Sequence, residues 1–179
     1  MGVSNRLAKL GRQVSVKHAA TDGALLSGVL GALILGSLYY NAEIWHQDYP
    51  PEVREKAGPM SPAAKRQRAV LAVPLFLTAL GVPVYSNLKL KRRNRGDLSF
   101  SSAFVNAYAV GQTWNIFDLL VIDYLLYKLR PDFAVLPGTG GMAAYDDFSF
   151  SGKGFLKGLW LGAIPSTVTA WLTSRTRNR

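Results

Sequence analysis

The charged residues of this chain are confined to short blocks, and four long stretches with almost no charge separate these blocks. The four stretches lie at about residues 23–42, 69–88, 101–127 and 154–174. Each is long enough to cross a hydrocarbon core roughly 30 Å thick, which requires about 20 apolar residues in a helix. We therefore predict an all-α fold, in which a four-transmembrane-helix bundle forms a single membrane domain over residues 1–179.

The predicted spans differ in how apolar they are. The second carries Pro74 and Pro83, which membrane helices tolerate and which predict a bend. The fourth contains Lys157 near its start, where a long side chain can extend to the lipid headgroups. The alternative is four buried core helices of a soluble protein, but such helices are usually shorter and are rarely bounded by a basic cluster as dense as that at residues 89–95.

The lysines and arginines predict the orientation of the spans. If the amino terminus lies inside, 12 of the 21 basic residues fall on the cytoplasmic side, including the dense cluster between the second and third spans. Because cytoplasmic flanks are enriched in Lys and Arg, we expect both termini to be cytoplasmic. The anionic headgroups of the lipid bilayer then account for the net charge of +10, and no nucleic acid is needed as a partner.

Residues 1–21 form a basic segment ahead of the first span. On a helical wheel Val3, Leu7, Leu10 and Val14 share one face, and the basic residues occupy the other. This pattern is typical of a short amphipathic helix that lies on a membrane surface. The alternative is a disordered basic tail.

The residue types in this chain exclude several kinds of site. The chain has no cysteine, which removes disulfides, thiolate metal sites and cysteine nucleophiles. Its two histidines, His18 and His46, lie at opposite ends of the first span and cannot ligate one metal or haem within a chain. Phosphate-loop, dinucleotide and nucleophile-elbow motifs are also missing from the sequence. We therefore expect no catalytic residues, no metal and no cofactor.

Small residues recur every four positions along the first and fourth spans, in a pattern that lets helix backbones approach closely. They are Gly28, Ala32 and Gly36 in the first span and Gly154, Gly158, Gly162 and Ser166 in the fourth. One interpretation is that the first span packs on the fourth within one chain. The other is an interface with a partner protein or with a second copy of the chain.

The third span is the most polar and holds the candidate functional residues. Asp118 lies near its centre, where an ionised carboxylate is costly and therefore suggests a function. Trp114 and Asn115 share its helical face, whereas Gln112 and Asp123 belong to another face about 140° away. Asp118 is interpreted either as a protonatable site or as a polar tie between helices, and Asp123 as an interfacial residue.

Three segments carry a resemblance to a known family. They read WHQDYP at Trp45–Pro50, NIFDLLVIDYLL at Asn115–Leu126 and PDFAVLPGTGGM at Pro131–Met142. In these segments the chain resembles an uncharacterised family of small bacterial integral membrane proteins. The resemblance implies a bacterial source and four membrane helices, and it implies no activity, substrate or cofactor.

The sequence leads to three functional hypotheses for a multi-pass protein of the bacterial inner or plasma membrane. The first is an interaction or accessory subunit that packs against a protein partner, or against itself, through the small-residue faces. The second is a proton- or ion-handling protein centred on Asp118. The third is a membrane-embedded enzyme that acts on lipid with Asp118 and Asp123 as acid and base, although the 140° between them argues against a shared site unless the helix is distorted.

Overall fold

The computed structural model describes residues 13–129 and 131–174, and within these residues every regular element is helical. The elements are α2 (Val16–Tyr40), η1 (Ala42–Asp48), α3 (Pro51–Ala57), α4 (Pro62–Arg93), α5 (Phe100–Phe117), η2 (Asp118–Asp123), α6 (Tyr124–Leu129), η3 (Asp132–Ala134), η4 (Ala143–Asp146), α7 (Ser149–Leu161) and α8 (Ala163–Ser174). The all-α prediction is confirmed. The predicted amphipathic segment lies largely outside the described residues, and its part from Val16 onward belongs to α2.

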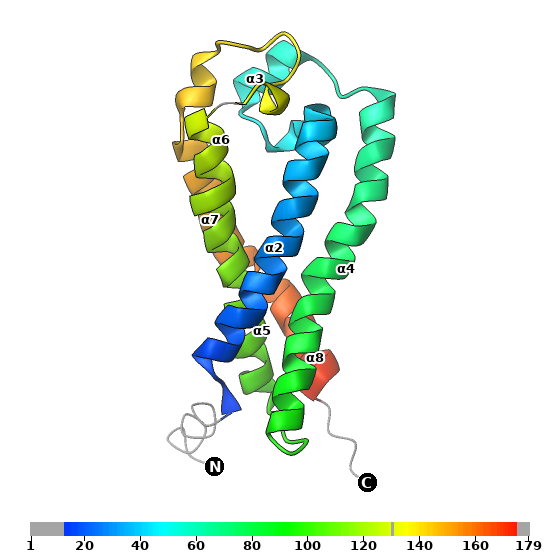
Figure 1. Cartoon of the computed structure of the whole chain (residues 1–179), viewed down its shortest axis with the longest axis vertical. Helices are drawn as coiled ribbons and strands as arrows, with labels where there is room; N and C mark the ends of the chain where they lie inside the picture. The colour runs from blue at the N-terminus through cyan, green and yellow to red at the C-terminus, as the bar shows by residue number, and fades with distance from the viewer. Residues whose placement is uncertain (1–12, 130, 175–179) are drawn as a thin grey trace.

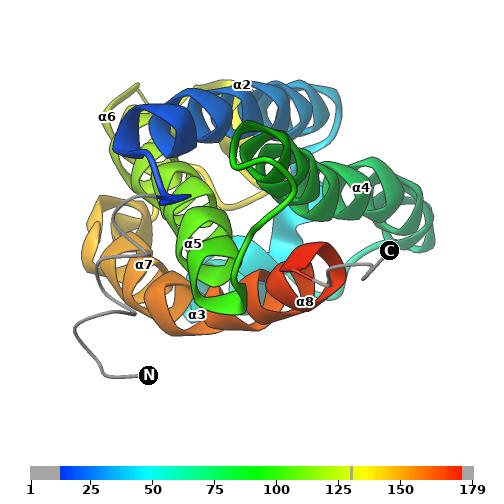
Figure 2. The ribbon, with the colours of Figure 1, turned by 90° about the horizontal axis from the view of Figure 1, so that it is seen from below.

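The elements form four long helical rods that lie side by side (Figure 1). The rods are α2, α4, the continuous run α5–η2–α6, and α7–α8. Viewed from below, α5 lies between α2 on one side and α7 and α8 on the other (Figure 2). Helix α5 contacts α2, α4, α7 and α8, so it is the central helix of the bundle. The described chain begins and ends at the same end of the bundle (Figure 1).

Serine caps set the start of three of these helices. Ser15 Oγ accepts a hydrogen bond from the backbone N–H of His18 at 3.4 Å, which starts α2. Ser61 and Ser99 do the same at the start of α4 and α5, each at 3.2 Å. A side-chain oxygen at this position satisfies a backbone donor that the helix leaves free. The first rod therefore starts at Val16, ahead of the predicted residue 23.

Within the described residues two helices, α2 and α4, are long and apolar enough to cross a membrane by length and composition. Helix α4 continues through both Pro74 and Pro83. The third and fourth rods are divided into shorter helices. Residues 118–123 form a π-helical turn in the third rod, and the fourth breaks at Gly162, where Pro165 has no N–H to donate to the carbonyl of Leu161.

The described part of the bundle buries polar side chains together with apolar ones such as Leu26 and Val110, and it exposes many large apolar side chains. Fully buried side chains between the rods include Ser86, Asn87, Ser102 and Asn106, each 0% exposed. Large apolar side chains face outward, among them Val70, Val73, Phe76 and Leu77 of α4 and Trp160, Ile164 and Leu172 of the fourth rod. An apolar surface of this extent marks contact with a membrane or another protein.

The two small-residue stripes do not pack against each other, because α5 lies between α2 and α7 (Figure 2). A Cβ added to Gly158 or Gly162 would collide with Asn115 or Gln112 of α5, so these two glycines allow α7 to approach α5. A Cβ added to Gly28 would have nothing within 4 Å. The first of the two packing interpretations, α2 on α7–α8, is therefore wrong.

The stripe of α2 instead faces outward. Gly28, Ala32 and Gly36 are exposed. Helix α2 meets α5 through a different face, on which Gly23, Ser27 and Gly31 are buried. These three residues also follow a four-residue spacing, so spacing alone does not distinguish the two faces.

Candidate functional site

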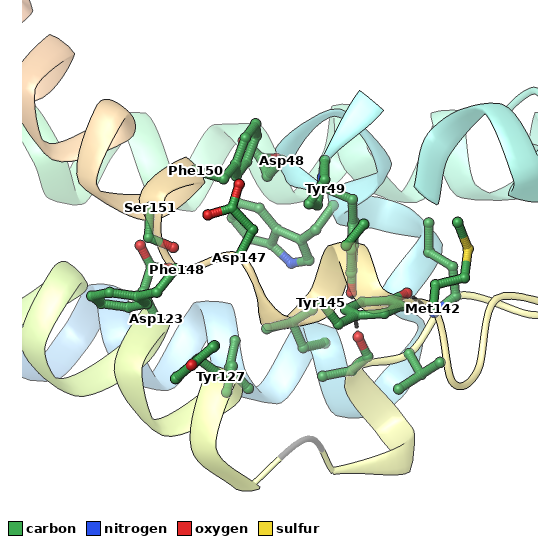
Figure 3. Close-up of a pocket in the computed structure, with 18 of the residues that line it drawn as sticks. Asp48, Tyr49, Asp123, Tyr127, Met142, Tyr145, Asp147, Phe148, Phe150 and Ser151 are labelled. Atoms are coloured by element: carbon green, nitrogen blue, oxygen red, sulfur yellow. Dashed lines mark hydrogen bonds between the residues drawn. The ribbon is translucent and has the colours of Figure 1, made fainter. Parts of the chain in front are cut away.

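A cavity of about 650 Å³ lies at the end of the bundle opposite the described chain ends, where α2, η1, the π-helical turn, the 132–147 loop and the start of α7 meet (Figure 3). Its lining includes five aspartates and six aromatic residues. They are Asp48, Asp118, Asp123, Asp132 and Asp147, and Trp45, Tyr49, Tyr127, Tyr145, Phe148 and Phe150. Among the described residues that line it, none is Lys, Arg or His. We call this space the outer cavity.

The π-helical turn brings the two predicted aspartates to the same cavity. The N–H of Tyr124 bonds to the carbonyl of Leu119, five residues back, as π-helical turns require. Residues five apart then come close to one face, so Asp118 and Asp123 both line the outer cavity instead of pointing about 140° apart. The helix distortion that a shared site needed is present. Such turns are rare and occur frequently at functional sites.

Two of the other predicted candidates, Gln112 and Asn115, connect α5 to α7. Asn115 Nδ2 donates to the carbonyl of Phe155 at 3.1 Å and to Gln112 Oε1 at 3.0 Å. Gln112 Nε2 donates to the carbonyl of Gly158 at 3.4 Å, and the Tyr108 hydroxyl to that of Leu159 at 2.9 Å. These bonds form a polar seam along the inner face of α5, away from the outer cavity. The seam is a packing device between two helices.

Two tyrosines hold the loop that covers the outer cavity. The Tyr49 hydroxyl donates to the carbonyl of Ala134 at 2.8 Å. Burial raises the pKa of Tyr49, and Tyr145 and Asp48 add to this shift, so the phenol stays neutral and keeps its proton for this bond. The Tyr145 hydroxyl accepts from the N–H of Leu136 at 3.2 Å and lies 2.7 Å from Thr139 Oγ1. The covering loop is thus fixed before any ligand enters.

The entrance of the outer cavity carries an ionised acid. Asp147 Oδ1 accepts the backbone N–H of Ser149 at 2.9 Å. Hydrogen bonds from Ser149 hold the pKa of Asp147 below its ordinary value, because they favour the charged form. Tyr127 packs on Phe148 with their ring centroids 5.3 Å apart, so an aromatic wall stands beside this carboxylate. The entrance therefore offers negative charge and aromatic faces together.

A second cavity of about 420 Å³ lies between α2, α4 and α5. Apart from Arg68 and Asp118, its described lining is apolar and includes Leu71, Leu75 and Trp114. Trp114 is the remaining predicted candidate, and it faces this space. We call it the lateral cavity.

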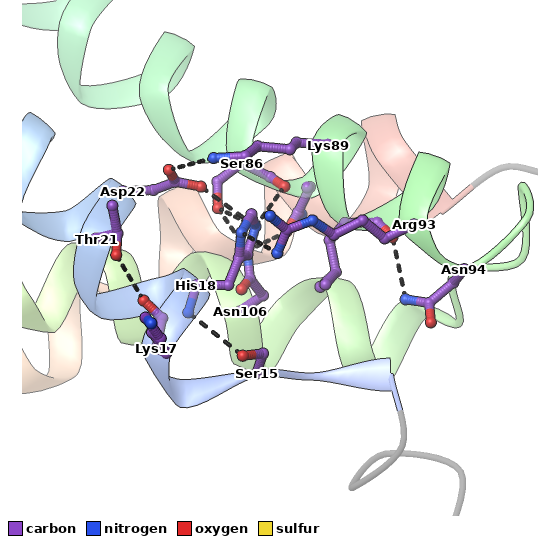
Figure 4. Close-up of polar contacts among 12 residues, drawn as sticks. Ser15, Lys17, His18, Thr21, Asp22, Ser86, Lys89, Arg93, Asn94 and Asn106 are labelled. Atoms are coloured by element: carbon purple, nitrogen blue, oxygen red, sulfur yellow. Dashed lines mark hydrogen bonds and ion pairs between the residues drawn. The ribbon is translucent and has the colours of Figure 1, made fainter.

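A buried polar cluster lies between α2 and α4, and its residues line neither cavity (Figure 4). His18 and Asp22, one turn apart on α2, meet Ser86, Lys89 and Arg93 of α4. Lys89 Nζ lies 3.1 Å from Asp22 Oδ1, and His18 Nε2 lies 3.2 Å from Asp22 Oδ2. Asp22 is only 3% exposed. This cluster was not predicted, because Asp22 and Lys89 lie at the polar limits of two apolar stretches in the sequence.

Both ring nitrogens of His18 have polar neighbours. Arg93 Nη1 lies 3.4 Å from Nδ1. Nε2 faces the carbonyl of Ser86 at 3.1 Å and the carboxylate of Asp22 at 3.2 Å. Among the described residues, no group of three or more His, Cys, Asp or Glu could hold a metal ion.

Comparison of the chain with protein-family models, curated proteins and solved structures gives no match. The resemblance to small bacterial membrane proteins remains a hypothesis, and the site is interpreted from its own geometry.

Proposed function

We propose that this chain is a multi-pass protein of a bacterial cell membrane, with the four rods as four membrane crossings. The large apolar side chains on the outside of the bundle and the hydrogen-bonded polar side chains buried between its helices support this proposal, because lipid favours both. The basic cluster at residues 89–95 lies at the end where the described chain begins and ends, since Asn94 donates to the carbonyl of Gln13. By the positive-inside rule this end is cytoplasmic, and the outer cavity opens on the other side.

We infer that the protein binds a small organic cation in the outer cavity, which develops the ion-handling hypothesis centred on Asp118. The observation that carries the inference is the lining of five aspartates and six aromatic residues, with no basic residue among its described members. Carboxylates attract a positive charge, and aromatic faces bind quaternary ammonium groups through cation–π contacts. A mostly preformed concave site of this size fits a small molecule.

The test uses choline and its uncharged carbon analogue, 3,3-dimethylbutanol, titrated into the purified protein in lipid nanodiscs by calorimetry. Choline should bind at least about tenfold more tightly than the neutral analogue, because the cation–π and carboxylate contacts require charge. Asp123→Asn should weaken choline binding. Glu55→Gln, which alters an exposed acid of α3 outside the cavity, should leave choline binding unchanged. Equal binding of the two compounds would refute the proposal.

The accessory hypothesis is the second candidate, and the outward stripe of α2 favours it. Gly28 and Gly36 are exposed with open space at their Cβ positions, so a helix of a partner could approach the backbone there. Gly28→Leu combined with Gly36→Leu should dissociate any oligomer or partner. Light scattering with detergent correction measures this mass. The hypothesis would be contradicted if wild type and variant had the same mass and the same co-purifying proteins.

A further inference from the structure

The two cavities share lining residues, and their polarity divides as in an amphiphile, because one holds acidic and aromatic residues and the other is lined mainly by apolar ones. We propose that the protein takes an amphiphilic cation, with its cationic head in the outer cavity and its alkyl tail in the lateral cavity. This rests on the proposed cation binding and goes further, because it assigns a tail site and an origin of the ligand in the membrane.

The first step is that the two cavities lie next to each other. Ile34, Trp45 and Asp118 line both cavities. The Trp45 ring is held in place because its Nε1 donates to Ser37 Oγ at 2.8 Å. A molecule that spans the two spaces would therefore pass beside the Asp118 carboxylate.

The second step is the chemistry of the lateral cavity. Its α4 wall runs from Arg68 to Ala79, a rise of about 16 Å at 1.5 Å per residue. This is about half of a hydrocarbon core roughly 30 Å thick, so the wall is as long as one lipid tail. Phe76, at its edge, is 68% exposed on the outer face of the bundle. A tail can thus enter sideways from the bilayer.

The third step is the direction of the ligand. The single described cation of the lateral cavity, Arg68, lies beside Asp48, with Nη2 4.0 Å from Oδ2. The carboxylate of Asp48 offsets the positive charge of Arg68, which an anionic lipid headgroup would need for binding. The acidic groups gather in the outer cavity instead, which orients a cationic head toward Asp118, Asp123 and Asp147.

The experiment compares three competitors, two cations and the anion dodecyl sulfate, on the wild type and two variants in phosphatidylglycerol nanodiscs. Dodecyltrimethylammonium and tetramethylammonium compete with radiolabelled choline. Ala72→Trp fills the lateral cavity, and Val70→Trp places the same side chain on the outer face of α4 as a matched control. If Ala72→Trp does not fold, Ala79→Trp replaces it, because Ala79 also lines the lateral cavity.

Ala72→Trp should weaken competition by the dodecyl compound about tenfold, because the indole takes the space of the tail. Its choline and tetramethylammonium affinities should stay unchanged, which also shows that the variant is folded. Partitioning of the dodecyl compound into lipid is common to all three proteins and cancels in the comparison.

Two results would overturn the tail site while leaving cation binding intact. One is an equal dodecyl affinity in Ala72→Trp and Val70→Trp. The other is equal competition by dodecyl sulfate, which has the same tail and the opposite charge. A failure of choline to bind any of the three proteins would overturn the proposed function itself.

Discussion

Gly154 and Gly158 lie one turn apart on the same stripe of α7, and the structure predicts opposite results when each becomes alanine. A Cβ at position 158 would lie 2.8 Å from Asn115 Cγ, well inside ordinary contact distance. A Cβ at position 154 would meet nothing within 4 Å. Sequence spacing gives the two glycines the same role, so this pair tests the packing of α7 on α5 directly.

The expected loss in the free energy of unfolding follows from the contacts of Asn115 that the new Cβ would break. Its amide makes two hydrogen bonds, to Gln112 Oε1 and to the carbonyl of Phe155. Losing both costs about 1.2 kcal/mol at the value of about 0.6 kcal/mol per bond measured between membrane helices. Crowding in a packed interior adds about 1–3 kcal/mol. The better helix propensity of alanine returns about 1 kcal/mol. Gly158→Ala should therefore lower the free energy of unfolding by about 1–3 kcal/mol.

Unfolding of the purified protein by SDS in mixed micelles, followed by far-UV circular dichroism, measures the difference. Gly154→Ala should be neutral or stabilising by up to about 1 kcal/mol, because only helix propensity changes. Adding Asn115→Ala to Gly158→Ala should recover part of the loss, since it removes the colliding side chain. The reasoning is refuted if both glycine variants shift unfolding equally, or if the Asn115 substitution gives no recovery.

Three further predictions use the same unfolding assay. Asn87→Ala removes three buried hydrogen bonds among α4, α5 and α8 and should cost about 2 kcal/mol; no loss would contradict the burial of this amide. Hydrogen bonds from Ser61 hold the pKa of Glu43 below its usual value of 4.5, so the stability they provide is present above that pH and is lost as pH falls through the lower, folded-state pKa. Glu43→Gln should reduce the dependence of the free energy of unfolding on acid pH. An unchanged dependence would contradict a stabilising role for the hydrogen bonds between Ser61 and Glu43. Lys89→Met leaves the carboxylate of Asp22 without its ammonium partner and should cost about 2 kcal/mol, and adding Asp22→Asn should restore part of this loss.

Part of the candidate site could be predicted from the sequence. Asp118 and Asp123 stand out as carboxylates in an apolar stretch, and both line the outer cavity. Their convergence could not be predicted, because a wheel with a fixed 100° per residue assumes a regular α-helix and the chain forms a π-helical turn there. Tyr49 ends the short helix η1 and Tyr145 lies in the short helix η4, and elements this short have no sequence periodicity that could have indicated them.

The sequence by itself determined that the chain is helical and where its apolar rods lie, because these properties depend on local composition and charge spacing. Only the tertiary structure decided which face of each rod is buried. Gly158 faces the interior and Gly28 faces outward because α5 is the central helix. Asp22 contacts Lys89, which is 67 positions away in the chain. Such choices depend on how whole helices fit together, and polar residues buried between helices lower the free energy only when partners from other rods reach them.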